Sequence, residues 1–223
     1  MSDVVLFDLD GTLNDSIELI ERSYRHVLSA HGSRAFDRDE WLGGLGRPLK
    51  WQFEQWTADP LEVQRMIATY RAHNNLHHDA MVKPYPGAVE AVRDLKARGV
   101  LVGVVTSKMK AGALRGLACA GFDDLFEVVI GCDDVREPKP APEPALLALE
   151  RLGASASRAF MVGDSPHDIR CGQQAGTRTA AAMWGPFSRK LFAQDEPDVW
   201  LEDPREMAQL FTDRDRAGAL RLS

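Results

Sequence analysis

Val4-Val5-Leu6-Phe7-Asp8-Leu9-Asp10-Gly11-Thr12 is the stretch of sequence that decides the fold prediction. Its first four residues, Val4–Phe7, form a continuous apolar run, which is typical of a strand buried on both faces of a parallel sheet. Asp8 and Asp10 follow at the carboxyl end of that strand. In an open α/β sheet this end borders the ligand crevice, so both acids are expected to reach a functional site together.

Apolar runs and helical patterns alternate over most of the chain. Further buried strands are predicted at residues 100–105, 127–130 and 159–162, with a weaker one at 179–183. Helices are predicted at 87–98, 110–120 and 143–152, each followed by a glycine that can end it: Gly99, Gly121 and Gly153. This alternation predicts the α/β class, with a doubly wound, Rossmann-like parallel sheet.

Residues 16–83 interrupt the alternation, because they hold long helical patterns and no convincing strand. Helices are predicted at 17–31 and 60–75, and the tryptophans between them, Trp41, Trp51 and Trp56, are expected to pack within this segment. The turn-rich residues 83–87 resemble a hinge. We therefore expect a core made of residues 1–15 and 84–223, with residues 16–83 inserted as a helical cap and a loosely held tail after Phe211.

Composition excludes several classes of protein. The 223 residues are 44% hydrophobic and 27% charged, as in ordinary globular proteins, and the formal net charge of −6 offers no basic field for nucleic acid. No segment resembles a secretory signal or a membrane span, so we expect a cytoplasmic protein with no membrane partner. Cys119, Cys132 and Cys171 form no CxxC pair and are expected to be reduced, mostly buried thiols without zinc. A monomer and a homodimer both stay open.

Polar groups follow the other predicted strands. Asp164 and Asp168 follow the strand at 159–162, Thr106 follows the strand at 100–105, and Lys139 lies in the proline-rich loop 137–140. Carboxylates that share one crevice repel each other unless a cation lies between them, and an all-oxygen donor set suits Mg²⁺. A hydroxyl and an ammonium beside them would suit the charge of a transferring phosphoryl group.

These motifs together resemble the haloacid dehalogenase superfamily, whose members carry DxDGT, a Ser or Thr, a Lys and GDxxxD in this order. The resemblance covers nearly the whole chain, including a helical cap between the first two motifs. It implies that Asp8 attacks phosphorus to form an aspartyl-phosphate and that Asp10 serves as general acid and then as general base. It also implies that Thr106 binds the phosphoryl oxygens and that Lys139 offsets the charge on Asp8.

The same resemblance implies a Mg²⁺ site made by Asp8, the backbone carbonyl of Asp10 and Asp164. Asp168 would hold a metal-bound water or orient a neighbour, and it could also cap a helix that begins near Ile169. His167 lies inside this acidic motif but lacks the further ligands of a zinc site.

Substrate contacts are predicted for Gly11 and Thr12 of the first motif, for Ser107 and for Arg47. Arg47 lies in the glycine-rich cap loop Gly43-Gly44-Leu45-Gly46-Arg47-Pro48. Its planar guanidinium could clamp a second phosphate or a carboxylate, and an ordinary surface arginine is an equal alternative. His77 and His78 could face substrate or pack inside the cap, and packing is the commoner role of such residues.

A finer resemblance links the chain to phosphoglycolate phosphatases and to bacterial inorganic pyrophosphatases of the superfamily. It is carried by residues 70–74, 77–79, 133–140 and 163–177, whereas Asn14 departs from the apolar residue of many relatives. The expected function is a Mg²⁺-dependent phosphohydrolase acting on a small phosphorylated metabolite, such as 2-phosphoglycolate or pyrophosphate. A phosphosugar mutase and a non-catalytic binding protein are the alternatives, while the presence of Asp10 disfavours dehalogenation.

Overall fold

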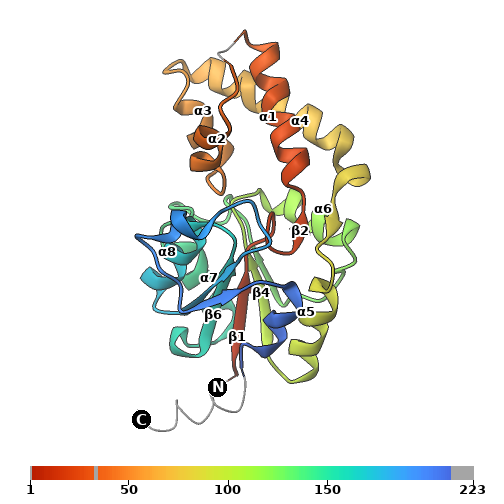
Figure 1. Ribbon diagram of the computed structural model, residues 1–223, viewed down its shortest axis with the longest axis vertical. Coiled ribbons are helices and arrows are strands. Elements are labelled where there is room, and N and C mark those ends of the chain that lie inside the picture. The colour runs from red at the N-terminus through yellow and green to blue at the C-terminus, as the bar shows by residue number, and fades with distance from the viewer. Residues whose placement is uncertain (1, 33–34, 212–223) are drawn as a thin grey trace.

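The computed structural model, which describes residues 2–32 and 35–211, contains a six-stranded parallel sheet in the order β5-β4-β1-β6-β7-β8 (Figure 1). The predicted doubly wound α/β fold is therefore confirmed. The strand bounds are β1 Val4–Phe7, β4 Leu101–Val105, β5 Val128–Ile130, β6 Ala159–Gly163, β7 Arg178–Ala182 and β8 Val199–Leu201. Because β1 lies between β4 and β6, the motifs that follow these three strands meet at one edge of the sheet.

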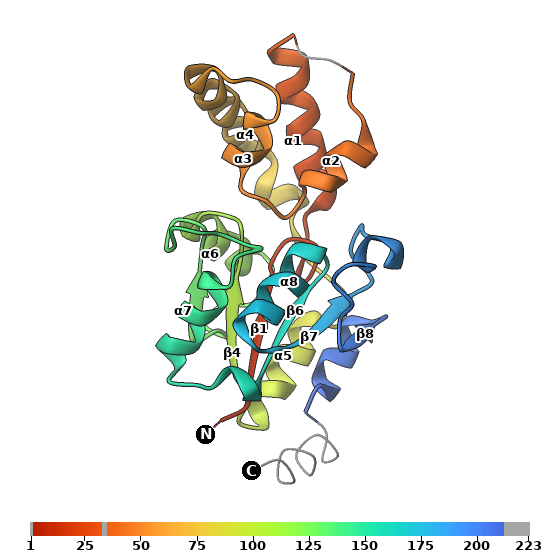
Figure 2. The same cartoon turned by 90° about the vertical axis from the view of Figure 1, so that its left-hand side faces the viewer.

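Helices cover both faces of the sheet (Figure 2), and alternate residues of β1 point to the two layers. Val5 and Phe7 pack in the cluster built by α5 (Ala88–Ala97), α6 (Lys110–Cys119) and the 3₁₀ segment Pro204–Gln209. Val4 and Leu6 pack on the opposite face against α7 (Glu143–Leu152) and α8 (Pro166–Ala175). Burial on both faces explains why the strand carries no polar residue before Asp8.

Most element ends in the core agree closely with those predicted, and the additional core elements are short. The three predicted helix-ending glycines all have positive φ, between +60° and +77°. The helix after the second acidic motif begins at Pro166, three residues before its expected start. β8 was not predicted, because Asp198 and Glu202 enclose its three residues and leave no longer apolar run around them. Two further short 3₁₀ turns cover Ala156–Arg158 and Arg189–Phe192.

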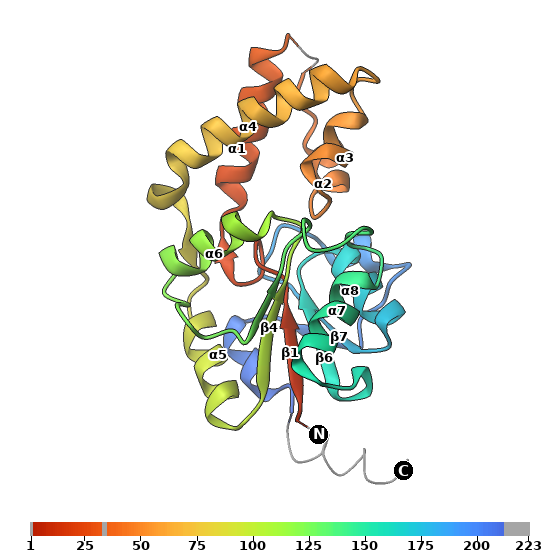
Figure 3. The same ribbon diagram turned by 180° about the vertical axis from the view of Figure 1, so that it is seen from behind.

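The inserted segment folds as four helices above the carboxyl ends of the strands (Figures 1 and 3). They are α1 Ile17–Ala30, α2 Arg38–Gly44, α3 Leu49–Glu54 and α4 Pro60–Met81. The prediction ended α4 too early, at Asn75, although the chain has no helix breaker before Val82. It also missed α2 and α3, because both are short and α2 ends in two glycines of low helix propensity.

Aromatic side chains fill the interior of this cap. Tyr24 of α1 stacks on Phe53, with 5.6 Å between ring centroids, and meets Trp56 edge-on at 4.7 Å. Trp41 is almost fully buried beside them, as expected. Trp51 departs from the expectation, since it is 36% exposed and carries the Arg47 guanidinium 4.7 Å above its ring.

Two connections join the cap to the sheet. Their residues pair as a short antiparallel ribbon of β2 (Asn14–Asp15) and β3 (Lys83–Pro84), which coincides with the predicted hinge. The ribbon supports the domain limits expected from the sequence, which stay a prediction. The tail expected to be loose after Phe211 lies outside the described residues. Among the helices described, none combines the length and apolar character required to span a lipid bilayer.

Candidate active site

Three buried carboxylates lie together at the carboxyl edge of the sheet. Asp8 directly follows β1, Asp164 directly follows β6, and Asp168 lies in the first turn of α8. One carboxylate oxygen from each lies within 4.8 Å of the others, and each residue is at most 7% exposed. Burial is the largest effect on Asp8, and it raises the pKa of Asp8 to about 7 although Lys139 opposes it.

Lys139 is the cation that holds this cluster together. Its Nζ donates hydrogen bonds of 2.5 Å to Asp8 Oδ1, 2.5 Å to Asp168 Oδ1 and 3.0 Å to the Val105 carbonyl. The ammonium has three N–H donors, so these bonds use all of them. Burial disfavours the charged ammonium, but the two carboxylates outweigh burial and raise the pKa of Lys139.

Asp168 serves as a structural anchor for this lysine. Its Oδ2 accepts hydrogen bonds from the Ser165 backbone N–H at 3.1 Å and from Ser165 Oγ at 2.5 Å, which makes a capping box at the start of α8. With Oδ1 bound to Lys139, both oxygens are engaged. Asp168 thus caps α8 and contacts Lys139 in this structure, and its predicted role in holding a metal-bound water stays a prediction.

The DxDGT loop folds tightly over Asp164. Gly11 has φ of +93°, and a Cβ there would lie 2.2 Å from Asp164 Oδ2, so only glycine fits. Thr12 is fully buried and its Oγ1 donates to Asp164 Oδ1 over a long 3.4 Å, while its carbonyl accepts from Trp184 Nε1 at 2.9 Å. Gly11 and Thr12 therefore shape the Asp164 position, and a substrate contact by either stays a prediction.

Asp164 is the carboxylate with the least compensation. Burial and the neighbouring charges of Asp8 and Asp168 raise its pKa well above the ordinary range, and Lys139 opposes this only in part. The cluster thus holds three carboxylates against one ammonium in a buried space. Its oxygen donors and excess negative charge fit a hard divalent cation such as Mg²⁺.

Asp10 is held by a residue that the sequence analysis missed. Asp10 Oδ1 accepts hydrogen bonds from Lys108 Nζ at 2.8 Å and from Ser16 Oγ at 2.6 Å. Burial would raise the pKa of Asp10, but Lys108 and Ser16 outweigh it, and the net pKa is lowered. The sequence signal for Lys108 was its position at a strand end, directly after Thr106-Ser107. It was missed because most loop lysines are solvated, so this position alone does not indicate a function.

Thr106 and Ser107 lie at the end of β4, as predicted. Thr106 is buried, and its Oγ1 accepts from the Lys108 backbone N–H at 3.1 Å. It does not cap the next helix, whose N-cap is Met109. Ser107 Oγ instead donates to the Gly46 carbonyl of the cap at 2.5 Å, so the structure shows Ser107 joining cap and core.

The glycine-rich cap loop reaches the core beside the carboxylates. A Cβ on Gly46 would lie 3.1 Å from Ser165 Oγ and 3.3 Å from the His167 ring, and His167 interacts with the Gly43 backbone. Arg47 is half-buried, and among described residues its buried Nε has no hydrogen-bond partner. Burial, with Arg47 nearby, lowers the pKa of His167 to about 4, so this imidazole is neutral.

The comparisons with known proteins agree with this geometry. The sequence model of the family described as haloacid dehalogenase-like hydrolase matches residues 5–182. The chain belongs to this family. A protein named pyrophosphatase PpaX from Halalkalibacterium halodurans is 38% identical over 206 residues, covering 92% of this chain and 95% of the relative. The protein of that name from Bacillus cereus strain G9842 is 39% identical over 213 residues, covering 96% and 98%.

Solved structures of the family have the same architecture. A protein assigned as a haloacid dehalogenase-like hydrolase from Bacteroides fragilis superposes with a TM-score of 0.86 at 27% identity, covering 93% of this chain and 100% of the other. One assigned as a phosphoglycolate phosphatase from Lactobacillus plantarum gives 0.82 at 25% identity, covering 95% and 100%. The recognition of the superfamily and of a phosphatase-type enzyme is confirmed.

The remaining sequence predictions for this haloacid dehalogenase-like hydrolase concern the cap histidines and the three cysteines. His78 is buried between α4 and α6, and His77 packs on His73 with 4.6 Å between ring centroids, so both histidines have packing contacts. All three cysteines are free, as expected. The expectation that they are mostly buried is wrong, because Cys119 is exposed and Cys132 is half-buried.

Proposed function

We propose that this chain is a Mg²⁺-dependent phosphohydrolase that cleaves a small phosphorylated metabolite through an aspartyl-phosphate on Asp8. The carrying observation is the buried cluster of Asp8, Asp164 and Asp168 around Lys139 at the edge of the sheet. Asp8, the Asp10 carbonyl and Asp164 would hold the ion. Bound Mg²⁺ would offset the charge of the carboxylates and of the transferring phosphoryl group.

The side chains support a two-step displacement. Lys139 and Asp168 fix Asp8 so that its second oxygen can attack phosphorus, and the bond from phosphorus to the leaving oxygen breaks. Thr106 follows β4, the strand that pairs with β1, and its Oγ1 would donate to a phosphoryl oxygen. Asp10 then takes a proton from water as that water attacks the phosphorus, which releases phosphate and restores Asp8.

The state of Asp10 favours pyrophosphate over a phosphate ester. Its ion pair with Lys108 and its lowered pKa keep the carboxylate ionised, which suits the base step and leaves no proton for the acid step. Phosphate is a weaker base than an alkoxide and leaves with less protonation. We therefore expect this chain to hydrolyse an anhydride more readily than an ester.

The cap loop and the relatives point in the same direction. Arg47 has a buried Nε that no described residue hydrogen-bonds, on a loop that touches the core, where a second phosphate would accept from it. The relatives named pyrophosphatase share 38–39% identity along nearly their whole length. A solved structure assigned as a β-phosphoglucomutase from Thermotoga maritima shares 23% identity and shows the fold alone, so it gives the mutase alternative no added support.

The test is phosphate release from pyrophosphate, 2-phosphoglycolate and hexose phosphates, each measured with Mg²⁺ and with a chelator. We expect turnover that requires the metal, with pyrophosphate the best substrate. Isomerisation of a hexose 1-phosphate without phosphate release would favour the mutase. No turnover of any of these compounds would favour the non-catalytic alternative.

A further inference from the structure

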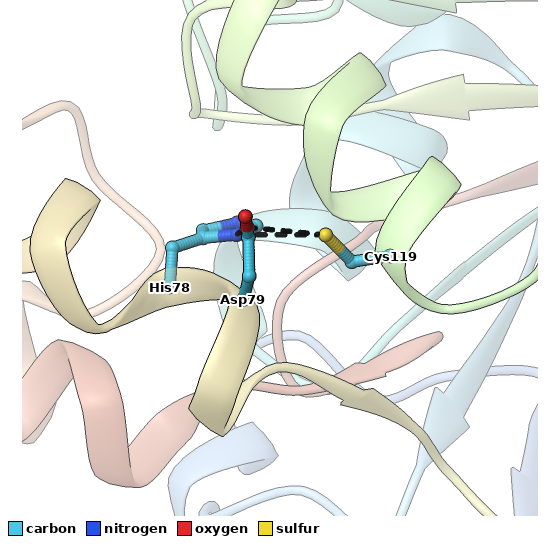
Figure 4. A group of neighbouring side chains, drawn as sticks. All are labelled: His78, Asp79 and Cys119. Carbon is cyan, nitrogen blue, oxygen red and sulfur yellow. Dashed lines mark hydrogen bonds and ion pairs between the residues drawn. The ribbon is translucent and has the colours of Figure 1, made fainter.

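A second group of metal-ligating side chains, distinct from the carboxylate cluster, lies where the cap meets the core (Figure 4). His78 and Asp79 belong to the last turn of α4, close to the connection between cap and sheet, and Cys119 is the last residue of α6. Cys119 is 40 residues from Asp79 in the sequence. Because of this separation, no short sequence motif contains all three residues. The fold alone brings these three donors together.

The three donor atoms have the spacing of a metal site. Asp79 Oδ1 lies 2.9 Å from His78 Nδ1 and 3.2 Å from Cys119 Sγ, and Sγ lies 4.0 Å from Nδ1. Ligand atoms around tetrahedral zinc are about 3.3–3.6 Å apart, given zinc bonds of about 2.0–2.3 Å. Shifts of about 0.5 Å in each pair would therefore complete the face of a tetrahedron. Asp79 and Cys119 are exposed, so an ion and a water ligand can reach the fourth position.

We propose that His78, Asp79 and Cys119 bind a zinc-like divalent ion that ties the cap helix α4 to the core helix α6. Imidazole and thiolate donors favour zinc over magnesium, whereas the all-oxygen cluster at the sheet edge favours the reverse. The chain would thus hold two kinds of cation at two separate places. This inference does not depend on the proposed phosphatase activity.

The existing hydrogen bonds show which protons the ion would replace. Cys119 donates its thiol proton to Asp79 Oδ1, and His78 Nδ1 contacts the same oxygen. On binding, the thiol proton is released, the neutral imidazole turns its Nδ1 lone pair to the metal and carries its proton on Nε2, and no electron is transferred. Arg115 Nε, 2.9 Å from Asp79 Oδ1, stays as an outer partner that orients the carboxylate.

Two buried polar side chains near Gly116, His78 and Asn14, bear on this proton arrangement. Among described residues, His78 Nε2 and both side-chain polar atoms of Asn14 lack hydrogen-bond partners, although Asn14 is fully buried and His78 is 3% exposed. Asn14 Nδ2 and His78 Nε2 lie 3.0 and 3.8 Å from the same point beside Gly116. A histidine that binds a metal through one ring nitrogen commonly donates a hydrogen bond from the other. The Asn14 side-chain oxygen would be the acceptor for His78 Nε2 once the Asn14 amide group is rotated by 180°.

The experiment uses Co²⁺ as a spectroscopic probe and Zn²⁺ as the competing ion, with the intact chain in excess Mg²⁺. Wild type should give a cobalt–thiolate charge-transfer band that saturates at one equivalent and disappears on adding Zn²⁺. Cys119→Ser should lose the band and bind Zn²⁺ at least ~10-fold more weakly. Cys132→Ser is the matched control, because Cys132 lies outside the group, and it should behave as wild type.

Thermal unfolding gives an independent readout. Because a ligand that binds only the folded chain raises the melting temperature, Zn²⁺ should raise it in wild type and Cys132→Ser but not in Cys119→Ser. No thiolate band in wild type, or a band that survives in Cys119→Ser, would overturn the proposal. Equal zinc affinity of wild type and Cys119→Ser would overturn it as well, whatever the phosphatase assays show.

Discussion

Lys139 shows how a single buried charge can organise a site. With 1% of the residue exposed, the ammonium is stable only because Asp8, Asp168 and a carbonyl accept its three protons. Removing one partner of such a buried ion pair lowers the free energy of unfolding by more than the intact pair contributes to it, because the remaining charge stays buried without a counter-charge. The residue therefore couples the fold to the chemistry.

Lys139→Met should lower the free energy of unfolding by about 3–5 kcal/mol, because Asp8 and Asp168 then lack their cation. Urea unfolding with a chelator present measures this. Lys110→Met is the control, since Lys110 is 38% exposed and its 3.6 Å ion pair with Asp134 lies near the surface. Equal losses in the two variants would show that Lys139 carries no special electrostatic role.

Gly11→Ala should abolish turnover. It should also lower the free energy of unfolding by more than the strain of placing an alanine at positive φ accounts for. The new Cβ would meet Asp164 Oδ2 at 2.2 Å, which displaces the carboxylate. Gly99→Ala has a similar φ, +77° against +93°, and open space around its Cβ, so it should lose only about 1–2 kcal/mol. Denaturant unfolding and phosphate release compare them, and a Gly11→Ala variant that keeps normal turnover would contradict the assigned packing.

Sequence could reveal some of these residues and not others. Most of the predicted site residues follow a recognisable apolar strand or lie in a motif, so their placement at one edge of the sheet was predictable. These residues are Asp8, Asp10, Thr106, Lys139, Asp164 and Asp168. Lys108 was not, because a loop lysine looks solvated until its carboxylate partner is located. Ser107 was expected at substrate, but the structure shows it bonded to a cap loop 61 residues away in sequence.

At the scale of elements, the cap loop between α2 and α3 is the part that couples cap and core. It contacts Ser107 through the Gly46 carbonyl and packs Gly46 against Ser165 and His167. Arg47 Nε is buried here without a partner among described residues, which gives the loop a donor for an anionic group.

Arg47→Met should lower kcat/KM for pyrophosphate about 30-fold, equivalent to about 2 kcal/mol for a lost hydrogen bond to a charged group. An aryl monophosphate, which has no second phosphate, should be hydrolysed nearly as well as by wild type. Lys50→Met is the matched variant, since the Lys50 side chain is 74% exposed and its ion pair with Glu54 is long, at 3.7 Å. Equal effects of Arg47→Met on both substrates would remove Arg47 from substrate recognition.

Elements were predictable in proportion to their length and periodicity. The predicted strands and helices of the core were found with shifts of one residue or none, apart from α8, which begins three residues before its expected start. Each has a buried face, and a glycine with positive φ follows α5, α6 and α7. α2, α3, β8 and the β2–β3 ribbon are short, and they exist because neighbouring segments cover them. Because these elements depend on tertiary contacts, the local sequence holds no pattern from which they could be predicted.

At the scale of the whole molecule, the topology explains why distant motifs form one site. β1 lies between β4 and β6, so the residues after these strands share one edge, and the cap is inserted directly after β1 at the same edge. The sheet supplies fixed carboxylates and the cap supplies a loop that covers them. How cap and core would meet was not readable from sequence, because that contact depends on side chains such as Ser107 and His167.

The rate of Mg²⁺-dependent phosphate release by Asp8→Asn, compared with wild type on pyrophosphate, tests the central claim most directly. We expect a fall of about 10⁴-fold or more, because a nucleophile is removed while the side-chain volume is kept. Circular dichroism should show that the variant keeps its fold. A folded Asp8→Asn enzyme that still hydrolyses pyrophosphate at a rate close to wild type would contradict the proposed covalent route.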